Sequence, residues 1–183
     1  SEEPAAPERS RLADIQDHLI VPGLLGFTNV GYHWHKRCWK PLAVSLRGRT
    51  VVVTGATSGL GQAAASQLAE LGARVILVGR NPDKAEDTRR EIVAATGNDN
   101  VAVALADLSL LADIRKLARK LLETEPRIHV LVNNAGVLLN QRTTTAEGNE
   151  TALATNLLAP CLLTEMLLPR LRESAPSRII NVS

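Results

Sequence analysis

The chain has 183 residues, of which 45% are hydrophobic, so it is long and apolar enough to form one folded domain. Its 21 basic and 19 acidic residues give a net charge of +2 at pH 7, so nucleic acid is not expected as a partner. The two cysteines, Cys38 and Cys161, lie far apart, which excludes a disulfide framework and favours a reducing, cytoplasmic location. Because the first residue is Ser1 and the last, Ser183, lies in an apolar run, we expect both ends to be cuts.

Residues 1–45 are expected to form an N-terminal extension. The first 11 residues are polar and contain proline. Apolar residues at helical spacing then predict a short amphipathic helix over residues 12–19. Pro22 and Gly23 would end this helix.

Residues 26–40 combine basic side chains with all the aromatic residues of the chain, which are Phe27, Tyr32, Trp34 and Trp39. One interpretation is a peripheral membrane contact, with rings and basic groups at the level of the lipid headgroups. We favour an extension that packs over the domain, because no apolar run approaches the about 20 residues of a spanning helix. His33, His35 and Cys38 supply at most three metal ligands where structural zinc takes four, so no metal site is predicted.

From residue 46 onwards, short apolar runs alternate with helical patterns. In chain order, the patterns predict strand 50–54, helix 60–71, strand 74–79, helix 82–96, strand 101–105, helix 109–123, strand 128–132, helix 150–173 and strand 178–182. Gly72 and Gly97 follow the first two helices as stop signals, and Pro82 stands where a helix can begin. Pro160 and Pro169 must bend or interrupt the last helix.

Five buried strands separated by helices predict βαβ units, which form a parallel sheet with helices on both faces. Right-handed crossovers then give an α/β, doubly wound Rossmann fold over residues 46–183. We expect this domain to be incomplete, with an unpaired edge after the fifth strand and uncovered apolar surface. In the first helix, a single face carries Leu60, Ala64, Leu68 and Leu71.

The most specific local signal is the sequence Thr54-Gly55-Ala56-Thr57-Ser58-Gly59-Leu60-Gly61, between a predicted strand and a predicted helix. This context is typical of a dinucleotide-binding turn. Gly55 permits a tight turn, Gly59 lets the backbone approach a pyrophosphate, and Gly61 lets the helix pack close to the strand. Free N–H groups at the start of the helix would face the phosphates. The candidate cofactor-binding residues of this turn are Gly55, Thr57, Ser58, Gly59, Leu60 and Gly61.

Two other kinds of loop could explain these glycines. A merely flexible connection between strand and helix would also contain glycines, but its placement here argues against that interpretation. A nucleoside-triphosphate loop is excluded more firmly, because Gln62 follows Gly61 where such a loop has lysine and then serine or threonine.

The spacing TGxxxGxG resembles that of the short-chain dehydrogenase/reductase family. Further matches are Asp107-Leu108 after the third strand, Asn133-Asn134-Ala135-Gly136 after the fourth, Asn156 on the long helix and the run 178–183. The resemblance adds as cofactor-binding candidates Asp107, Leu108, Asn134, Ala135 and Gly136. It makes Asn156 the catalytic candidate, the alternative being a helix-kink asparagine that satisfies backbone groups near Pro160.

Arg80 indicates which cofactor is preferred. The residue that discriminates NAD from NADP follows the second strand of such folds, and an acid there would bind the free ribose hydroxyl. This sequence has Val78-Gly79-Arg80-Asn81, with no acid, and Arg80 can pair with a 2′-phosphate. We therefore predict NADP(H) as the preferred cofactor, with NAD(H) as the alternative. A solvated charge at the strand end is the other interpretation of Arg80.

The resemblance implies an NADP(H)-dependent oxidoreductase of a carbonyl or alcohol, with a small-molecule substrate and a homo-oligomer for the complete protein. The family's catalytic serine, tyrosine and lysine cannot be assigned, because the only tyrosine is Tyr32, and Ser183 resembles the serine before the catalytic one. The alternative function is a non-catalytic nucleotide-binding or interaction module. Within the family, the chain is similar to the retinol-dehydrogenase-like group, and its basic, aromatic segment resembles that of the group around SDR family member 12.

Overall fold

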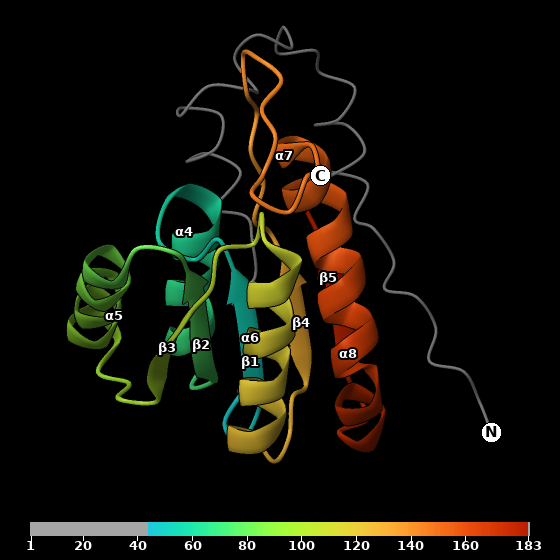
Figure 1. Cartoon of the computed structure of the whole chain (residues 1–183). Helices are drawn as coiled ribbons and strands as arrows, with labels where there is room; N and C mark the ends of the chain where they lie inside the picture. The colour runs from blue at the N-terminus through green and yellow to red at the C-terminus, as the bar shows by residue number, and fades with distance from the viewer. Residues whose placement is uncertain (1–43, 183) are drawn as a thin grey trace, which may run out of the picture. The chain divides into compact units, whose positions relative to one another are not determined.

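Five parallel strands form one sheet at the centre of residues 44–182, the part of the chain that the computed structural model describes. In chain order, the elements are β1 (Thr50–Thr54), α4 (Gly59–Glu70), β2 (Arg74–Gly79), α5 (Pro82–Thr96), β3 (Val101–Leu105), α6 (Leu111–Thr124), β4 (Val130–Asn133), α7 (Thr151–Leu153), the π-helix η1 (Ala154–Leu158), α8 (Ala159–Glu173) and β5 (Arg178–Asn181) (Figure 1). The strand order is β3-β2-β1-β4-β5, so the chain crosses to the other side of β1 after β3. The predicted α/β Rossmann fold is confirmed.

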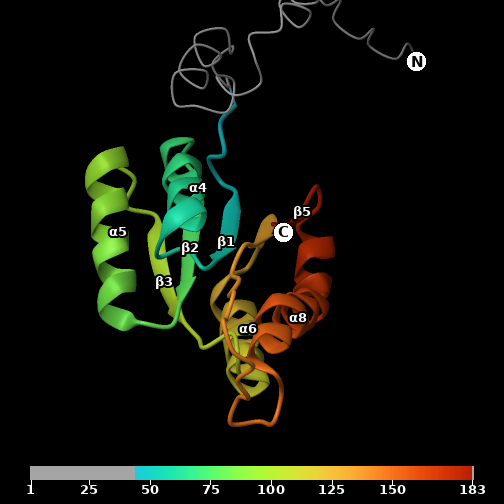
Figure 2. The same cartoon turned by 90° about the horizontal axis from the view of Figure 1, so that it is seen from above.

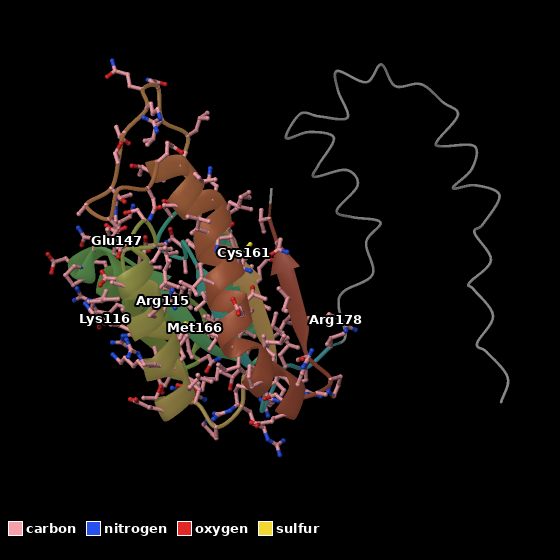
Figure 3. The ribbon with its side chains drawn as sticks, turned by 45° about the vertical axis from the view of Figure 1, so that its right-hand side comes forward. Arg115, Lys116, Glu147, Cys161, Met166 and Arg178 are labelled. Atoms are coloured by element: carbon pink, nitrogen blue, oxygen red, sulfur yellow. The ribbon has the colours of Figure 1, made fainter. Side chains whose placement is uncertain are left out.

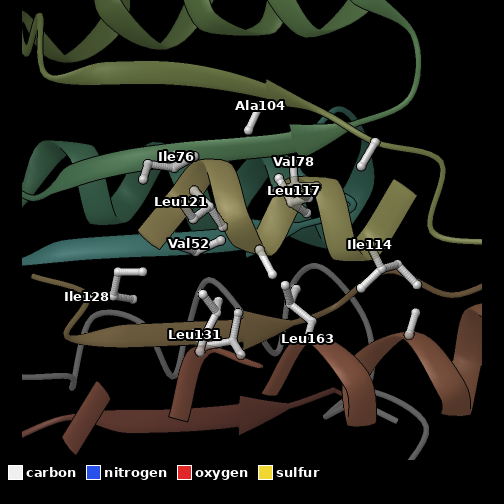
Figure 4. Packing of buried hydrophobic residues seen from close by; sticks show 14 of the residues in the cluster. Val52, Ile76, Val78, Ala104, Ile114, Leu117, Leu121, Ile128, Leu131 and Leu163 are labelled. Carbon is white, nitrogen blue, oxygen red and sulfur yellow. The ribbon is translucent and has the colours of Figure 1, made fainter. Parts of the chain in front are cut away.

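Helices cover both faces of the sheet, α4 and α5 on one side and α6 and α8 on the other (Figure 2). Alternate residues of each strand enter opposite layers: Val51 packs with the α4 and α5 side, whereas Val52 packs with the α6 and α8 side. Figure 4 shows Val52, Ile76 and Val78 against leucines of α6 and α8. Because both faces are buried, β1 and β2 are almost continuously apolar.

The boundaries of the first three strands agree with the sequence prediction, and the later ones differ in informative ways. β4 begins at Val130, not at the predicted Ile128, and α6 begins at Leu111, not at Ser109. The interpretation of all five strands as buried is wrong for β5, whose residues are all exposed. Among the described elements β5 pairs only with β4, so it forms one edge of this sheet, and β3 forms the other.

The buried face of α4 differs from the leucine face of the sequence pattern. Leu60 is 75% exposed, and the buried residues are Gly61, Ala65 and Ala69. The small side chains on this face allow α4 to lie close to the strands. The face is therefore selected by residue size and not by hydrophobicity. The predicted leucine face is therefore only partly buried: Leu68 packs against the core and Leu60 does not.

The run Thr151–Glu173 is helical throughout, with the predicted interruption before Pro160. The interruption takes the form of one π-helical turn, a feature that often marks functional sites. The interruption predicted at Pro169 does not occur, because this residue lies inside the continuous helix α8. By length and composition, this 23-residue run is the one candidate for a membrane span among the described residues. In the fold it lies against the sheet, with Leu163, Leu167 and Leu171 buried in the core.

Several predictions of the sequence analysis lie outside the described residues. They concern helix 12–19, the aromatic and basic segment 26–40 with its three potential metal ligands, and Ser183. The division into residues 1–45 and 46–183 also stays a prediction.

His129, just before β4, is a buried histidine whose protonation is expected to weaken the fold. It is buried, with 4% of its surface exposed, and its Nδ1 accepts a hydrogen bond from the backbone N–H of Thr50 at 3.0 Å. That bond requires a neutral imidazole. Burial, together with the positive charges of Arg49 and Arg127, lowers the pKa of His129.

We expect the free energy of unfolding to decrease as the pH is lowered, because His129 is buried in its neutral form. As the pH decreases, the unfolded imidazole binds its proton first, near its ordinary pKa of about 6.5. The contribution of neutral His129 is therefore complete above this value and is lost as the pH falls towards the lower folded pKa. Urea unfolding between about pH 7.5 and 5 should show a loss of about 1–3 kcal/mol, the cost of an unsatisfied buried group. The loss should be smaller in His129→Asn, whose Oδ1 can still accept from Thr50, and equal losses would contradict this assignment.

Candidate cofactor-binding site

The turn between β1 and α4 has a backbone that favours glycine at its first position. Gly55 has φ of +64°, in the left-handed region, and a Cβ there would come within 2.9 Å of the Ala135 Cα. The next residue, Ala56, donates its backbone N–H to the Val78 carbonyl at 3.2 Å. The turn is thus fixed between the ends of β2 and β4.

Gly61 brings three segments together at the start of α4. A Cβ on this residue would lie 2.3 Å from the Gly55 carbonyl oxygen and 2.5 Å from the Asn134 Nδ2. No residue larger than glycine fits without moving backbone. The helix therefore begins directly against the turn and against the loop that follows β4.

The first turn of α4 offers unsatisfied backbone donors. Its N-cap residue, Ser58, makes no side-chain capping bond, and the first turn contains no acidic residue. Next to it, a Cβ on Gly59 would meet nothing within 4 Å. An exposed helix N-terminus with free N–H groups and open space is suited to bind an anion.

Thr54 ties the end of β1 to the loop after β4. Its Oγ1 accepts hydrogen bonds from the backbone N–H groups of Asn134 at 3.0 Å and Ala135 at 3.1 Å. The same hydroxyl donates to the Val132 carbonyl at 3.2 Å. In return, the Asn134 Nδ2 donates to the Thr54 carbonyl at 3.0 Å. The side chain of Asn134 thus connects two strands, and sequence reasoning missed Thr54 as a member of the site.

Asn133 was also missed. Its Nδ2 donates to the Thr164 hydroxyl at 3.1 Å and to the Asn181 Oδ1 at 2.9 Å, which joins β4 to α8 and to β5. The side chain is buried, and among the described residues its Oδ1 has no partner. The sequence placed Asn133 at a strand end, as the first residue of the Asn133–Gly136 match, but it gave no sign of the partners, which are distant in the chain.

Asn156 lies in the π-helical turn η1 and binds the loop after β4. Its Oδ1 accepts from the Val137 backbone N–H at 2.8 Å, and its Nδ2 donates to the Val137 carbonyl at 2.9 Å. The interpretation in which it satisfies backbone groups near Pro160 is therefore wrong. Its Oδ1 lies 3.6 Å from the position that a Cβ on Gly136 would take. The catalytic candidate thus stands beside the Asn134–Gly136 loop.

Arg80 and Asp107 follow the two neighbouring strands. Arg80 is exposed directly after Gly79, where a Cβ would come within 2.7 Å of the Thr57 Cγ2. This close approach places Arg80 beside the glycine-rich turn. The Asp107 Oδ1 accepts from the N–H of Ser109 at 2.9 Å and from its hydroxyl at 2.7 Å. Leu108 packs against the core on the α6 side.

The predicted cofactor-binding residues therefore lie on the side of the sheet where the strands end. They follow β1, β2, β3 and β4, whose carboxyl ends all point to that side because the strands are parallel (Figure 1). Ligands of open α/β sheets bind at the carboxyl ends of the strands, where the strand order reverses. No group of three potential metal ligands occurs among residues 44–182.

Comparison with known proteins identifies the family. Residues 49–183 match the family model described as short chain dehydrogenase. Retinol dehydrogenase 11 of Homo sapiens is 48% identical over 140 residues, which cover 76% of this chain and 44% of that protein. This chain thus spans less than half the length of that relative.

Solved structures agree. The Pseudomonas aeruginosa RhlG/NADP active-site complex has a TM-score of 0.65 and 37% identity, over 75% of this chain and 55% of that one. A metagenomic short-chain oxidoreductase in complex with NADP has a TM-score of 0.67 and 39% identity, over 75% and 62%. The matched residues 49–183 do not reach segment 26–40, so the likeness to SDR family member 12 stays a prediction. The chain belongs to the short-chain dehydrogenase family and is similar within it to the retinol dehydrogenases 11, 12 and 13.

Proposed function

We propose that this chain forms the cofactor-binding half of an NADP(H)-dependent oxidoreductase that acts on a carbonyl or alcohol substrate. One observation carries the proposal: the glycine-rich turn after β1 is locked to the Asn134–Gly136 loop after β4. This arrangement leaves the free N–H groups at the start of α4 beside open space. Solved relatives that contain NADP support the cofactor.

The residues present fit a dinucleotide. The backbone from Thr57 to Gly61 would hold the pyrophosphate, because any side chain on Gly59 would enter the open space that the phosphates need. Asp107 and Leu108 would border the adenine, and Ala135 and Gly136 would line the other side of the cofactor. When bound, NADP(H) supplies or accepts the hydride.

Asn156 is proposed to act at the reacting end of the cofactor. It is the polar side chain that the fold brings next to Gly136, and its amide is oriented by both backbone groups of Val137. The names of the relatives make a retinol-type alcohol the first substrate to test. A cytoplasmic location, a membrane contact through residues 26–40 and a homo-oligomer are further proposals.

The preference for NADP(H) should depend on Arg80. Its guanidinium is exposed at the end of β2, beside the turn, where it can form a charge-assisted contact with a 2′-phosphate. Arg80→Ala should weaken NADP⁺ binding by about ten- to a hundredfold, as expected for a hydrogen bond to a charged group. NAD⁺ binding should stay within about twofold of wild type, because NAD⁺ has no 2′-phosphate for Arg80 to contact. A twofold change in affinity corresponds to less free energy than one typical hydrogen bond. Isothermal titration of both cofactors measures the two effects.

Arg90→Ala is the matched control, because Arg90 is an exposed arginine on α5 that pairs with Asp87. It should leave the affinity for both cofactors unchanged. If Arg80→Ala kept the wild-type preference, the phosphate contact would be rejected.

The alternative is a module that binds the nucleotide without catalysis. Both functions expect NADP⁺ binding, but only the enzyme oxidises NADPH in the presence of an aldehyde. A coding sequence that continues past Ser183 into a Tyr-x-x-x-Lys sequence would favour the enzyme, and a stop codon there would favour the module.

A further inference from the structure

The segment between β4 and α7 forms a long loop beyond the carboxyl ends of the strands (Figure 1). We call residues 138–149 the β4–α7 loop. Its returning arm is held by the Thr151 backbone N–H, which donates to the Thr143 carbonyl at 2.9 Å, and by the hydroxyl groups of the same two residues at 2.8 Å. A tight turn at the far end is closed by the Gly148 N–H on the Thr145 carbonyl at 2.9 Å. The loop therefore has an internal structure of its own.

Glu147 fastens this loop to another helix. Its two carboxylate oxygens accept from the backbone N–H groups of Leu111 at 2.7 Å and Ala112 at 2.9 Å, in the first turn of α6. Figure 3 shows Glu147 beside that turn. The N-cap residue of α6 is Leu110, which cannot cap with its own side chain. A carboxylate from 36 positions downstream supplies the missing acceptors at the positive end of the helix dipole.

The other end of the loop is fastened at Asn156. The two bonds between this residue and the backbone of Val137 fix the start of the loop beside Gly136. Directly after this anchor come Leu138, 98% exposed, and Leu139, 41% exposed. Two exposed leucines contribute little to folding where they stand, and they follow Val137 in the chain, the residue to which the candidate catalytic Asn156 bonds. Apolar side chains at the mouth of a polar site are suited to contact an apolar ligand.

We infer that Glu147 is a positioning residue for substrate binding. By capping α6, it fixes the β4–α7 loop so that Leu138 and Leu139 form one apolar wall for the alcohol or aldehyde. This inference rests on the proposed function, because the wall matters only if an apolar substrate binds beside Asn156. Glu147 touches neither cofactor nor substrate in this assignment, so its effect on cofactor binding is small.

The test uses the full chain and two titrations, NADP⁺ alone and all-trans-retinol added to the NADP⁺-loaded protein. Glu147→Ala should weaken retinol binding about tenfold, equivalent to about 1.4 kcal/mol. NADP⁺ binding should change by less than about twofold, because Glu147 does not touch the cofactor in this assignment. A twofold change corresponds to less free energy than one typical hydrogen bond. Hydrogen exchange of residues 138–149 should become faster. Glu123→Ala, which removes an exposed carboxylate from the last turns of the same helix, is the matched control and should change none of these quantities.

A double variant separates loop positioning from simple loss of helix stability. Leu110→Asp, combined with Glu147→Ala, restores a cap to α6 in its own first turn but does not fasten the loop. We expect the double variant to regain the wild-type unfolding midpoint while retinol binding stays weak and loop exchange stays fast. Recovery of retinol binding together with stability would overturn the inference.

The proposed function and this inference fail in different ways. A wild-type chain without measurable NADP⁺ affinity would reject the proposed function. Wild-type protein that binds NADP⁺ but not retinol, or Glu147→Ala protein with unchanged retinol affinity and loop exchange, would reject the inference alone.

Discussion

Replacing Gly61 with alanine should abolish NADP⁺ binding and destabilise the fold. The added Cβ would lie 2.3 Å from the Gly55 carbonyl oxygen and 2.5 Å from the Asn134 Nδ2, so either the turn or α4 must move. Insertion of one carbon into a packed site typically costs about 1–3 kcal/mol. Because the moved groups include the turn proposed to hold the pyrophosphate, the affinity should fall by more than about a hundredfold, a change above about 2.7 kcal/mol. Urea unfolding and isothermal titration measure the two effects.

Two asparagine variants make this experiment specific. Gly59 and Gly97 both have positive φ, and a Cβ on either meets nothing within 4 Å, so asparagine, which tolerates this region, should fit at both. Gly59→Asn should remain folded but lose NADP⁺ affinity, because its side chain enters the phosphate space. Gly97→Asn, at the end of α5, should carry the same backbone strain as Gly59→Asn but keep the wild-type NADP⁺ affinity. Wild-type NADP⁺ affinity in Gly61→Ala would mean that the cofactor does not bind at this turn.

The parts of the fold that depend on residues close together in the sequence could be predicted from it. The strand β1, with its five buried residues, and the positive φ at Gly55 both follow from local composition. Helix α5 begins at Pro82 and ends before Gly97 for equally local reasons. These elements place the proposed cofactor residues at one edge of the sheet, so most of the candidate site could be located before any coordinates were known.

The contacts that hold the site together could not be predicted in this way. Thr54 accepts hydrogen bonds from residues about 80 positions away, and the sequence around Thr54 does not indicate those partners. The cap of α6 comes from Glu147, although the local sequence at Leu110 offers no capping side chain. Such contacts form only when the sheet brings distant strand ends together, so a pattern within one segment carries no signal of them.

Asn156 illustrates the limit from another side. Its place on the long helix could be recognised, and Pro160 correctly announced an interruption there. The alternative to a catalytic role was that the asparagine side chain would bond the freed backbone groups near the proline. Instead the π-helical turn directs the amide to Val137, on a different segment. The role of Asn156 stays a prediction, and its hydrogen-bond partner could not be predicted, because that partner depends on the register between the helix and the loop after β4.

Thr54→Val should lower the free energy of unfolding by about 2–4 kcal/mol, although valine has nearly the same shape as threonine. The substitution leaves the backbone N–H groups of Asn134 and Ala135 without their acceptor, in a position where Thr54 is only 3% exposed. Each unsatisfied buried group costs about 1–3 kcal/mol, and because Asn134 and Ala135 are only partly buried, we expect the lower part of the summed range. Urea unfolding at constant pH measures the change.

Cofactor binding should suffer in the same variant, because the threonine hydroxyl is the contact through which β1 fixes the loop after β4. Thr54→Ser is the matched control: it keeps the hydroxyl and loses only a methyl group, so it should cost less than about 1.5 kcal/mol and keep most of the NADP⁺ affinity. Equal losses in the two variants would show that the methyl packing, not the hydroxyl, matters at this position. A large loss confined to valine would instead mean that one side-chain oxygen holds together the two loops between which the proposed cofactor binds.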